Sequence, residues 1–362
     1  MVVYFTFIFA SLFFLFLSRT TLCLKSRSIS IIISCISASF LIFLSTFRSV
    51  GVGTDSHNYV SIFNNIQDFD NVIFYTLAQG EFGFWYLNYI GHFFSDDYFI
   101  IFFLISIIIV YSYYSTIFKL SPYKVSSLLV LLLMGPYLFH FNGARQGIAI
   151  AIFFVSIQFL IDKSFARYTI CILVGFLFHK SIIICIPLYF LFVKKLDFKQ
   201  FALFSFLFII CFLMFNEVVS LVSEVDSRYS GYSQKQNSSG GVVTNAFNII
   251  LFFWFYVCKK INSIDSKLYD LGFTLFFFGT LINIISLLLQ VNPSGFLRFS
   301  LYFSQVSVFI LPISIYSFKN NKIKFLILLY GATFMTLYFY FTTSTFSNLV
   351  PYYFNPLISE YL

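Results

Sequence analysis

Long apolar runs separated by polar connections make up most of this chain. Twelve runs are candidate membrane spans: 2–18, 29–47, 98–118, 125–141, 144–161, 167–179, 181–193, 200–217, 244–258, 268–289, 298–317 and 324–341. About 20 apolar residues are needed for a helix to cross a hydrocarbon core of about 30 Å. A helix also satisfies its own backbone hydrogen bonds, which lipid cannot do. The pattern therefore predicts an all-α polytopic membrane protein of about 12 transmembrane helices, forming a single domain over 1–362.

The polar connections differ in charge. Of the 22 Lys and Arg residues, 16 lie after the odd-numbered runs. The positive-inside rule assigns these connections to the cytoplasm. The remaining connections face outward, and two of them are long, at 48–97 and 218–243. Because the inner connections are short, we expect any chemistry at the outer face or within the membrane.

Composition narrows the class of protein further. The chain is 59% hydrophobic and only 10% charged, whereas soluble domains carry about 25% charged residues. The pI of about 9.0 does not indicate nucleic-acid binding, because the basic residues lie in short loops and form no soluble basic face. The acidic pairs Asp68/Asp70 and Asp96/Asp97 are weak candidates for a metal site. We expect neither a metal nor another cofactor.

Four cations stand out on the outward side: Arg48, Arg145, Lys180 and Arg298. Their distances along the chain from the cytoplasmic ends of their runs place them at or just below the outer surface. A charge held at that depth is costly and is usually functional. A group of such cations favours an anionic ligand that arrives from the lipid, such as a polyprenyl diphosphate.

The paired runs 167–179 and 181–193 are too short to cross the membrane twice. Only 26 residues separate Arg167 from Lys194. A helix starting at Arg167 would raise His179 by about 18 Å, which is less than the roughly 30 Å core. This geometry predicts an outward-open cavity with His179 and Lys180 on its floor.

Five short motifs occur along the chain in a fixed order. They are FRSVGVGTDSHNYVSIF (47–63), GEFGFWYLNYIGHFF (80–94), FNGARQGIAIAI (141–152), FHKSIIICIP (178–187) and FLRFSLYF (296–303). Their order, spacing and topology resemble the EpsG-type family of polysaccharide polymerases, which includes Wzy-like O-antigen polymerases. The resemblance runs from about residue 40 to about residue 310.

This resemblance implies an activity and a location. Such proteins extend a glycan on undecaprenyl diphosphate at the outer face of the bacterial inner membrane, by transferring the growing chain en bloc to a lipid-linked repeat unit. Related transferases have the GT-C fold and use no nucleotide sugar. The expected partners are the undecaprenyl-diphosphate-linked oligosaccharide, membrane lipid, a chain-length regulator and a flippase, with no nucleic acid.

The reaction assigns expected roles to residues in the motifs. The candidates for binding diphosphate are Arg48, Arg145, Lys180 and Arg298. The candidates for the general base that accepts a proton from the acceptor hydroxyl are Asp55, Glu81 and His179. The weaker candidates for glycan contact are Tyr59, Trp85 and Arg228. Each also has an ordinary reading, as an interfacial anchor, a helix-capping residue, a loop-internal ion pair or part of an aromatic belt.

Three other functions remain open. An O-antigen ligase and another polyprenyl-dependent GT-C glycosyltransferase are rival enzymes, and a flippase for lipid-linked oligosaccharide is the non-enzymatic alternative. A flippase is expected to have an approximate internal repeat and charges throughout a central cavity. The chain shows no convincing repeat, and its outward cations gather toward one face.

Overall fold

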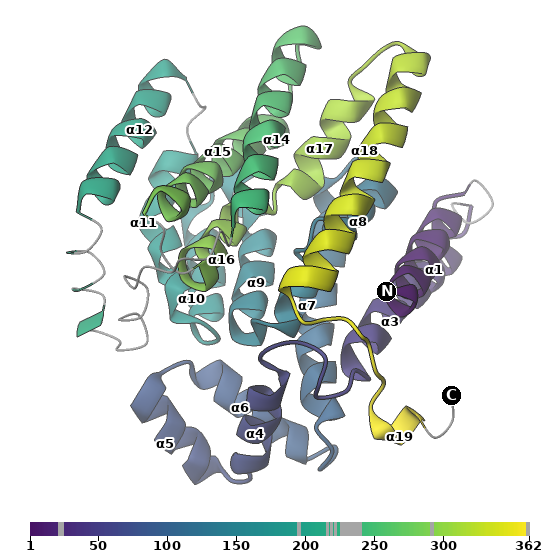
Figure 1. Ribbon diagram of the computed structural model, residues 1–362, viewed down its shortest axis with the longest axis vertical. Coiled ribbons are helices and arrows are strands. Elements are labelled where there is room, and N and C mark those ends of the chain that lie inside the picture. Colours follow the sequence, from purple (N-terminus) through teal and green to yellow (C-terminus); the bar gives the residue numbers. More distant parts are fainter. Residues whose placement is uncertain are drawn as a thin grey trace. The chain divides into compact units, whose positions relative to one another are not determined.

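The computed structural model describes residues 1–20, 25–193, 197–214, 217, 220, 223–224, 241–289 and 293–359. These residues are mainly helical (Figure 1). The chain divides into two compact units. Unit 1 comprises 1–156, 166–183 and 325–362, and unit 2 comprises 157–165 and 184–324.

Unit 1 holds most of the long helices. Its α-helices are α1 (Val2–Ser18), α3 (Arg27–Thr46), α4 (Ser56–Asn65), α5 (Phe69–Gln79), α6 (Phe82–His92), α7 (Phe99–Leu120), α8 (Lys124–Leu133), most of α9 (Ala144–Ile161), α10 (Phe165–Phe176), most of α18 (Asn321–Phe341) and α19 (Pro356–Ser359). It also holds the 3₁₀ turns η1 (Leu138–Phe141) and η2 (Lys180–Ile184) and the π-helical turn η4 (Thr342–Phe346). Helix α3 packs against α1 and α7. The hydroxyl groups of Ser11, Ser37 and Tyr114 hydrogen bond to one another across these three helices. Small residues and hydroxyl pairs of this kind hold helices together where lipid gives no hydrophobic drive.

Unit 2 is built around one buried helix, α15 (Lys267–Leu288). Around it pack α11 (Cys185–Phe192), α12 (Phe198–Leu213), α14 (Val242–Ile261), α16 (Pro293–Ser304) and α17 (Ser307–Tyr316). At Gly279 an added Cβ would lie 3.2 Å from the backbone oxygen of Ser300, so glycine permits the close approach of α16. The indole of Trp254 donates to the hydroxyl of Ser314 across α14 and α17.

The predicted spans fall on apolar helices with similar bounds, but not all of these helices are long enough to cross a membrane. Seven helices are long and apolar enough to cross a membrane, or up to eight if the pair Leu297–Ser304 and Ser307–Tyr316, bent by 48°, is one span. Four predicted spans correspond to shorter apolar helices: Val2–Ser18, Phe165–Phe176, Lys180–Phe192 and Phe198–Ile210. A polytopic membrane protein is therefore confirmed, while the count of 12 transmembrane helices and the GT-C fold stay predictions.

The predicted outer loop 48–97 is itself folded. It contains α4, α5 and α6, which lie together at one end of α7 within unit 1 (Figure 1). Asp68 caps α5 by accepting a hydrogen bond from the amide of Asn71 at 2.8 Å. Gly80 ends α5 with a φ of 71° and a ψ of −156°, a backbone conformation that essentially only glycine adopts. Most of the second predicted loop, 218–243, lies outside the described residues.

The segment after α18 returns to the C-terminal end of α3. The hydroxyl of Tyr4 donates to the backbone oxygen of Leu349, and the hydroxyl of Tyr352 donates to that of Leu44. The backbone of Arg48 pairs with Phe354 in an antiparallel bridge. These bonds fix the connection that leads from α3 into α4.

Candidate functional site

The turn between α5 and α6 carries the central residue of the site. Glu81 follows Gly80 and has a φ of 64°, which is uncommon for a residue other than glycine. Such backbone conformations persist only where the surroundings impose them, and they cluster at functional sites. Here the turn directs the Glu81 side chain inward, where it is fully buried.

Two glycines let this turn approach the segment that follows α10. The amide of Gly83 donates to the backbone oxygen of Leu177 at 2.8 Å, and an added Cβ there would lie 3.0 Å from the Leu177 Cβ. An added Cβ at Gly80 would lie 2.5 Å from the Lys180 Cε. The GEFG motif is therefore a docking turn that fits closely against residues 177–180.

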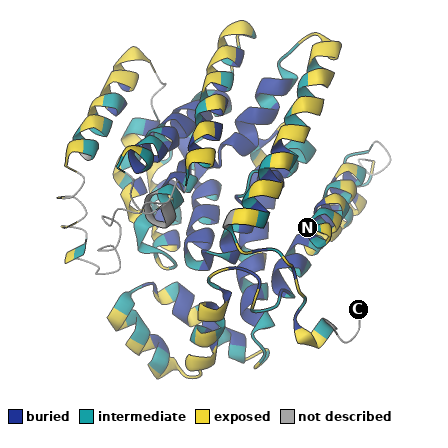
Figure 2. Cartoon of the chain, viewed as in Figure 1, coloured by how far each residue is buried: buried dark blue, intermediate teal, exposed yellow. Residues whose placement is uncertain are grey.

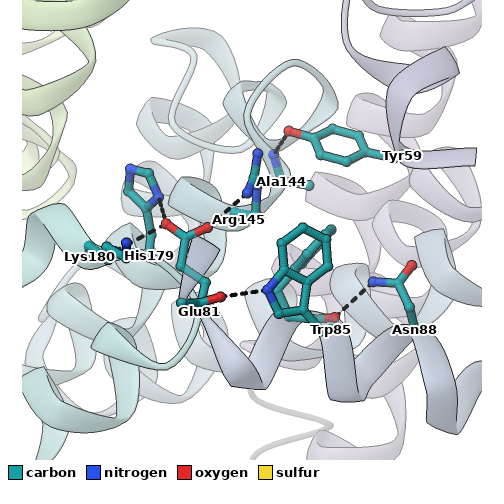
Figure 3. Close-up of polar contacts among 10 residues, drawn as sticks. Tyr59, Glu81, Trp85, Asn88, Ala144, Arg145, His179 and Lys180 are labelled. Carbon is teal, nitrogen blue, oxygen red and sulfur yellow. Dashed lines mark hydrogen bonds and ion pairs between the residues drawn. The ribbon is translucent and has the colours of Figure 1, made fainter. Parts of the chain in front are cut away.

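The docked turn brings Glu81 against Arg145 and His179 (Figure 3). The Nη1 of Arg145 donates to Glu81 Oε2 at 2.8 Å, and His179 Nδ1 lies 2.9 Å from Oε1. The backbone amide of Lys180 also donates to Oε1, at 3.3 Å. The side chains of Arg145 and His179 are 20% and 19% exposed, whereas that of Glu81 is 0% exposed. The carboxylate thus lies behind the two groups that reach the surface.

Aromatic residues hold Arg145 from the other side. Its guanidinium carbon lies 5.5 Å from the centre of the Trp85 ring and 5.6 Å from that of Phe84. The Trp85 indole N–H donates to the backbone oxygen of Gly80. The amide of Ala144 donates to the hydroxyl of Tyr59 at 2.8 Å and so fixes the start of α9 (Figure 3).

The two aromatic residues expected to contact glycan are buried. Tyr59 packs edge-on against Phe84, and Trp85 stacks on Tyr75 with ring centres 5.2 Å apart. As folded, neither ring face is open to a sugar. Instead, Tyr59 bonds to the backbone of Ala144, next to Arg145, and Trp85 bonds to the backbone of Gly80, next to Glu81. The aromatic pattern in the sequence does not reveal these contacts.

This arrangement supports proton transfer by the histidine. An ionised carboxylate only accepts hydrogen bonds, so the nitrogen facing Glu81, Nδ1, carries the proton. The other nitrogen, Nε2, then has a lone pair available to a ligand. A carboxylate paired with histidine in this way fixes the tautomer and the ring orientation. Among the described residues, no group of three His, Cys, Asp or Glu side chains is placed to hold a metal ion.

Arg48, expected to hold a diphosphate, lies elsewhere in unit 1 and is 1% exposed. Its Nη1 donates to the backbone and hydroxyl oxygens of Ser45, both at 3.1 Å. Its guanidinium lies between the rings of Phe102 and Phe141, 3.8 Å and 4.3 Å from their centres. Burial lowers the pKa of Arg48 to about 10, so it stays charged at neutral pH. As folded, Arg48 presents almost no surface to a ligand, and its binding of a diphosphate stays a prediction.

The other predicted residues are placed as follows. Asp55 is half-buried at the start of α4 and accepts a hydrogen bond from the hydroxyl of Thr54 at 3.0 Å. Arg298 lies on α16 in unit 2. Arg228 lies outside the described residues. Four of the predicted residues, Glu81, Arg145, His179 and Lys180, are brought together.

Sequence reasoning missed Asn142, which precedes α9 by two residues. Its side-chain oxygen accepts from the amide of Thr54 at 2.8 Å, and its side-chain nitrogen donates to the backbone oxygen of Ser347 at 2.7 Å. The polar Asn-Gly pair just before Arg145, inside an apolar region, was the available signal.

Comparison with known proteins agrees with the motifs. The EpsG family matches residues 31–354, which is most of the chain. The resemblance expected from the five motifs is therefore confirmed. No curated protein and no solved structure matches this chain.

Proposed function

Because the chain belongs to the EpsG family, a family of polysaccharide-polymerase-like membrane proteins, we propose that it is a glycosyltransferase that polymerises a surface polysaccharide. The proposed reaction moves the growing glycan from undecaprenyl diphosphate to the sugar of an incoming lipid-linked repeat unit. The observation that carries the proposal is the buried Glu81 carboxylate holding both Arg145 and His179 at a partly exposed surface.

The proposed step is a displacement at the anomeric carbon of the donor sugar. The acceptor hydroxyl oxygen forms a bond to that carbon, and the bond from the carbon to the diphosphate oxygen breaks. The hydroxyl proton passes to His179 Nε2, and the lipid diphosphate leaves with the bonding electron pair. General-base help of this kind contributes about 10²–10⁴ in rate.

Glu81 acts as a positioning residue in this scheme. Both of its oxygens accept hydrogen bonds, from Arg145 on one side and from His179 and the Lys180 amide on the other. Its negative charge stabilises the imidazolium that forms when His179 takes a proton. Of the three candidate bases in the sequence, His179 is therefore the one we propose.

Arg145 is the proposed contact for the donor diphosphate. Only its Nη1 is engaged by Glu81, and its side chain is 20% exposed. Arginine stays charged at any depth and binds phosphate through two nitrogens. Such a cation stabilises the negative charge that develops on the leaving diphosphate. Lys180, beside the turn, is proposed as a further diphosphate contact, while Arg298, in unit 2, stays a prediction from the sequence.

The outward orientation of the site is proposed from the distribution of charge. The connections rich in Lys and Arg alternate with those that contain Glu81 or adjoin Arg145 and His179. In a bacterium this places the chemistry at the periplasmic face of the inner membrane. A flippase that supplies the repeat unit and a chain-length regulator are the proposed partners.

The test is the length distribution of surface polysaccharide in cells that lack this gene and carry a plasmid copy of it. We expect the wild-type copy to give a ladder and His179→Ala to give only single repeat units. His57→Ala is the matched control, because His57 is exposed on α4. A normal ladder from His179→Ala at normal protein levels would exclude the proposed base.

Deletion of the gene separates the proposed polymerase from its rivals. Without a polymerase, single repeat units still reach the final acceptor. Without a ligase or a flippase, no glycan reaches it. Complete loss of surface glycan would therefore overturn the polymerase in favour of these alternatives.

A further inference from the structure

Helices α5 and α6 present an apolar face that the rest of unit 1 leaves uncovered. We propose that this face lies in the outer interfacial layer of the membrane, with lipid acyl chains as its occupant. The α5–α6 face is defined by its exposed apolar residues, which are Phe69, Ile73, Phe74, Leu77, Phe82, Tyr86 and Phe93.

The face begins with one side of α5. Phe69, Ile73 and Leu77 follow one another at four-residue spacing, so they share one side of the helix. Phe74 lies next to this row. Leu77 is 83% exposed and Phe74 is 66% exposed. The opposite side of α5 is packed, with Val72 buried and Tyr75 stacked on Trp85. Exposed residues along α5 are yellow in Figure 2.

Aromatic contacts continue the face onto α6. Phe69 meets the rings of Tyr86 and Tyr89 edge-on, at centre distances of 6.4 Å and 5.9 Å. Tyr86 in turn stacks on Phe82 at 5.3 Å. The exposed apolar residues therefore form a connected surface over both helices.

The neighbouring helix α4 shows what a water-facing helix looks like in the same segment. Its exposed residues are all polar: His57, Asn58, Ser61, Asn64 and Asn65. On α5 the exposed acid, Asp70, is confined to the first turn, where it complements the helix dipole. The two helices lie in one folded segment but are built for different surroundings.

The position of the segment identifies the occupant as lipid. Helices α3 and α7, which directly precede and follow it, are both long and apolar enough to span a membrane. Residues 47–98 are therefore tethered at the membrane surface at both ends. A helix there with an apolar side and aromatic residues lies in the interface plane, with that side buried about 5–10 Å into the headgroup and acyl boundary.

This placement has a consequence that rests on the proposed function. The turn that carries Glu81 joins α5 to α6, so embedding the face fixes the depth of Glu81, Arg145 and His179. That depth is the level of lipid headgroups, where the diphosphate of a lipid-linked glycan also lies. The carrier lipid would then reach Arg145 without leaving the bilayer.

The test measures depth and does not depend on activity. A nitroxide label is attached at Leu77→Cys, and separately at Asn58→Cys on α4, in full-length protein whose six natural cysteines are replaced by serine. The protein is placed one copy per lipid nanodisc. Collision rates of each label are then measured with oxygen, which concentrates in lipid, and with a water-soluble nickel chelate.

We expect the label at position 77 to collide with oxygen several-fold more often than with the nickel chelate. The label at position 58 should show the reverse. Equal accessibility of both labels to the nickel chelate would place α5 in water and overturn the proposal. Poor access of both reagents to position 77 would mean that protein covers it, which also overturns the proposal. Either outcome leaves the His179 polymerisation test unaffected.

Discussion

Arg48 and Arg145 lie in two regions of unit 1 with opposite designs. Arg48 is buried between two phenylalanine rings and donates only to neutral oxygens among the described residues. Arg145 is partly exposed and is paired with the buried carboxylate of Glu81. Both are single arginines beside apolar helices in the sequence, so the difference lies in what surrounds them.

The comparison contrasts a cation whose contacts are made within the fold with the partly exposed, paired cation that the proposed reaction would use. The two ring faces stabilise the Arg48 charge, and such contacts contribute about 2 kcal/mol or more when desolvated. Arg145 is only partly satisfied, because Glu81 engages one nitrogen and leaves the rest of the fork for a ligand. A residue whose bonding is completed within the fold has no capacity left for a substrate.

Residues 141–145 join the two regions. The Phe141 ring covers Arg48, Asn142 bonds to Thr54 and Ser347, and the Ala144 amide bonds to Tyr59. Arg145 then reaches Glu81. The buried arginine therefore lies in the same connected structure as the Arg145–Glu81 pair.

The largest expected effect comes from removing the charge of Glu81. Glu81→Gln keeps the shape but removes the counter-charge of Arg145 and one of the two accepting oxygens, so Arg145 and His179 can no longer both be satisfied. We expect polymerisation to fall by about 10²–10⁴, the range for loss of a general base. The measurement is the glycan ladder at matched protein levels.

Asp55→Asn is the matched control for Glu81→Gln. It removes the other candidate carboxylate, which is half-buried at the start of α4. We expect it to leave the ladder close to wild type. Equal loss from both variants would mean that Asp55 shares the chemistry, and the contrast drawn between the two regions would need revision.

The same substitution at each arginine separates the two roles. Arg48→Lys should lower the free energy of unfolding by about 3 kcal/mol, since it loses the flat contact with two rings and bonds from a charged donor. The polymerising activity of each folded molecule should be retained. The loss is measured as a lower thermal unfolding midpoint in detergent.

Arg145→Lys should lower the activity and leave the stability unchanged. Lysine keeps the charge beside Glu81 but loses the planar fork, so we expect about a tenfold loss of activity, equivalent to about 1.4 kcal/mol, with an unchanged unfolding midpoint. If both variants lowered stability alone, the functional reading of Arg145 would be wrong.

Gly80→Ala tests the docking turn and should have a moderate effect. Its Cβ would lie 2.5 Å from the Lys180 Cε. Its φ of 71° with ψ of −156° lies in a region that essentially only glycine adopts, which costs another residue of order 1–3 kcal/mol. We expect shorter glycan chains and a slightly lower unfolding midpoint. Gly331→Ala on α18 is the control, because no atom lies within 4 Å of an added Cβ there. Equal effects of the two would rule out a specific role for the close fit at Gly80.

Four residues that the structure brings together were already candidates in the sequence, but their arrangement was not predictable. Charges are costly near a membrane, so Glu81, Arg145, His179 and Lys180 were visible as isolated polar residues in apolar surroundings. Their convergence depends on Gly80 and Gly83, which allow an approach that no periodic pattern encodes.

The surroundings of Arg48 were not predictable either, because Phe102 and Phe141 lie far from it in the chain and resemble lipid-facing residues in the sequence. The positions and approximate lengths of the apolar helices were likewise predictable, including the short helix α10, whereas the folding of residues 48–97 into α4, α5 and α6 depends on tertiary packing.

The smallest expected effect concerns Asn142, which connects the two regions. Asn142→Ala removes two hydrogen bonds, each contributing about 1 kcal/mol, and leaves the Thr54 amide and the Ser347 oxygen without these partners. Because Arg145 follows three residues later, we expect a two- to fivefold loss of activity, an order-of-magnitude figure equivalent to roughly 0.4–1 kcal/mol, and a slightly lower unfolding midpoint. Asn58→Ala, on the exposed side of α4, should change neither. A loss of stability without any loss of activity would show that the support around Arg48 can loosen while Arg145 stays in place, and the two regions would then be independent.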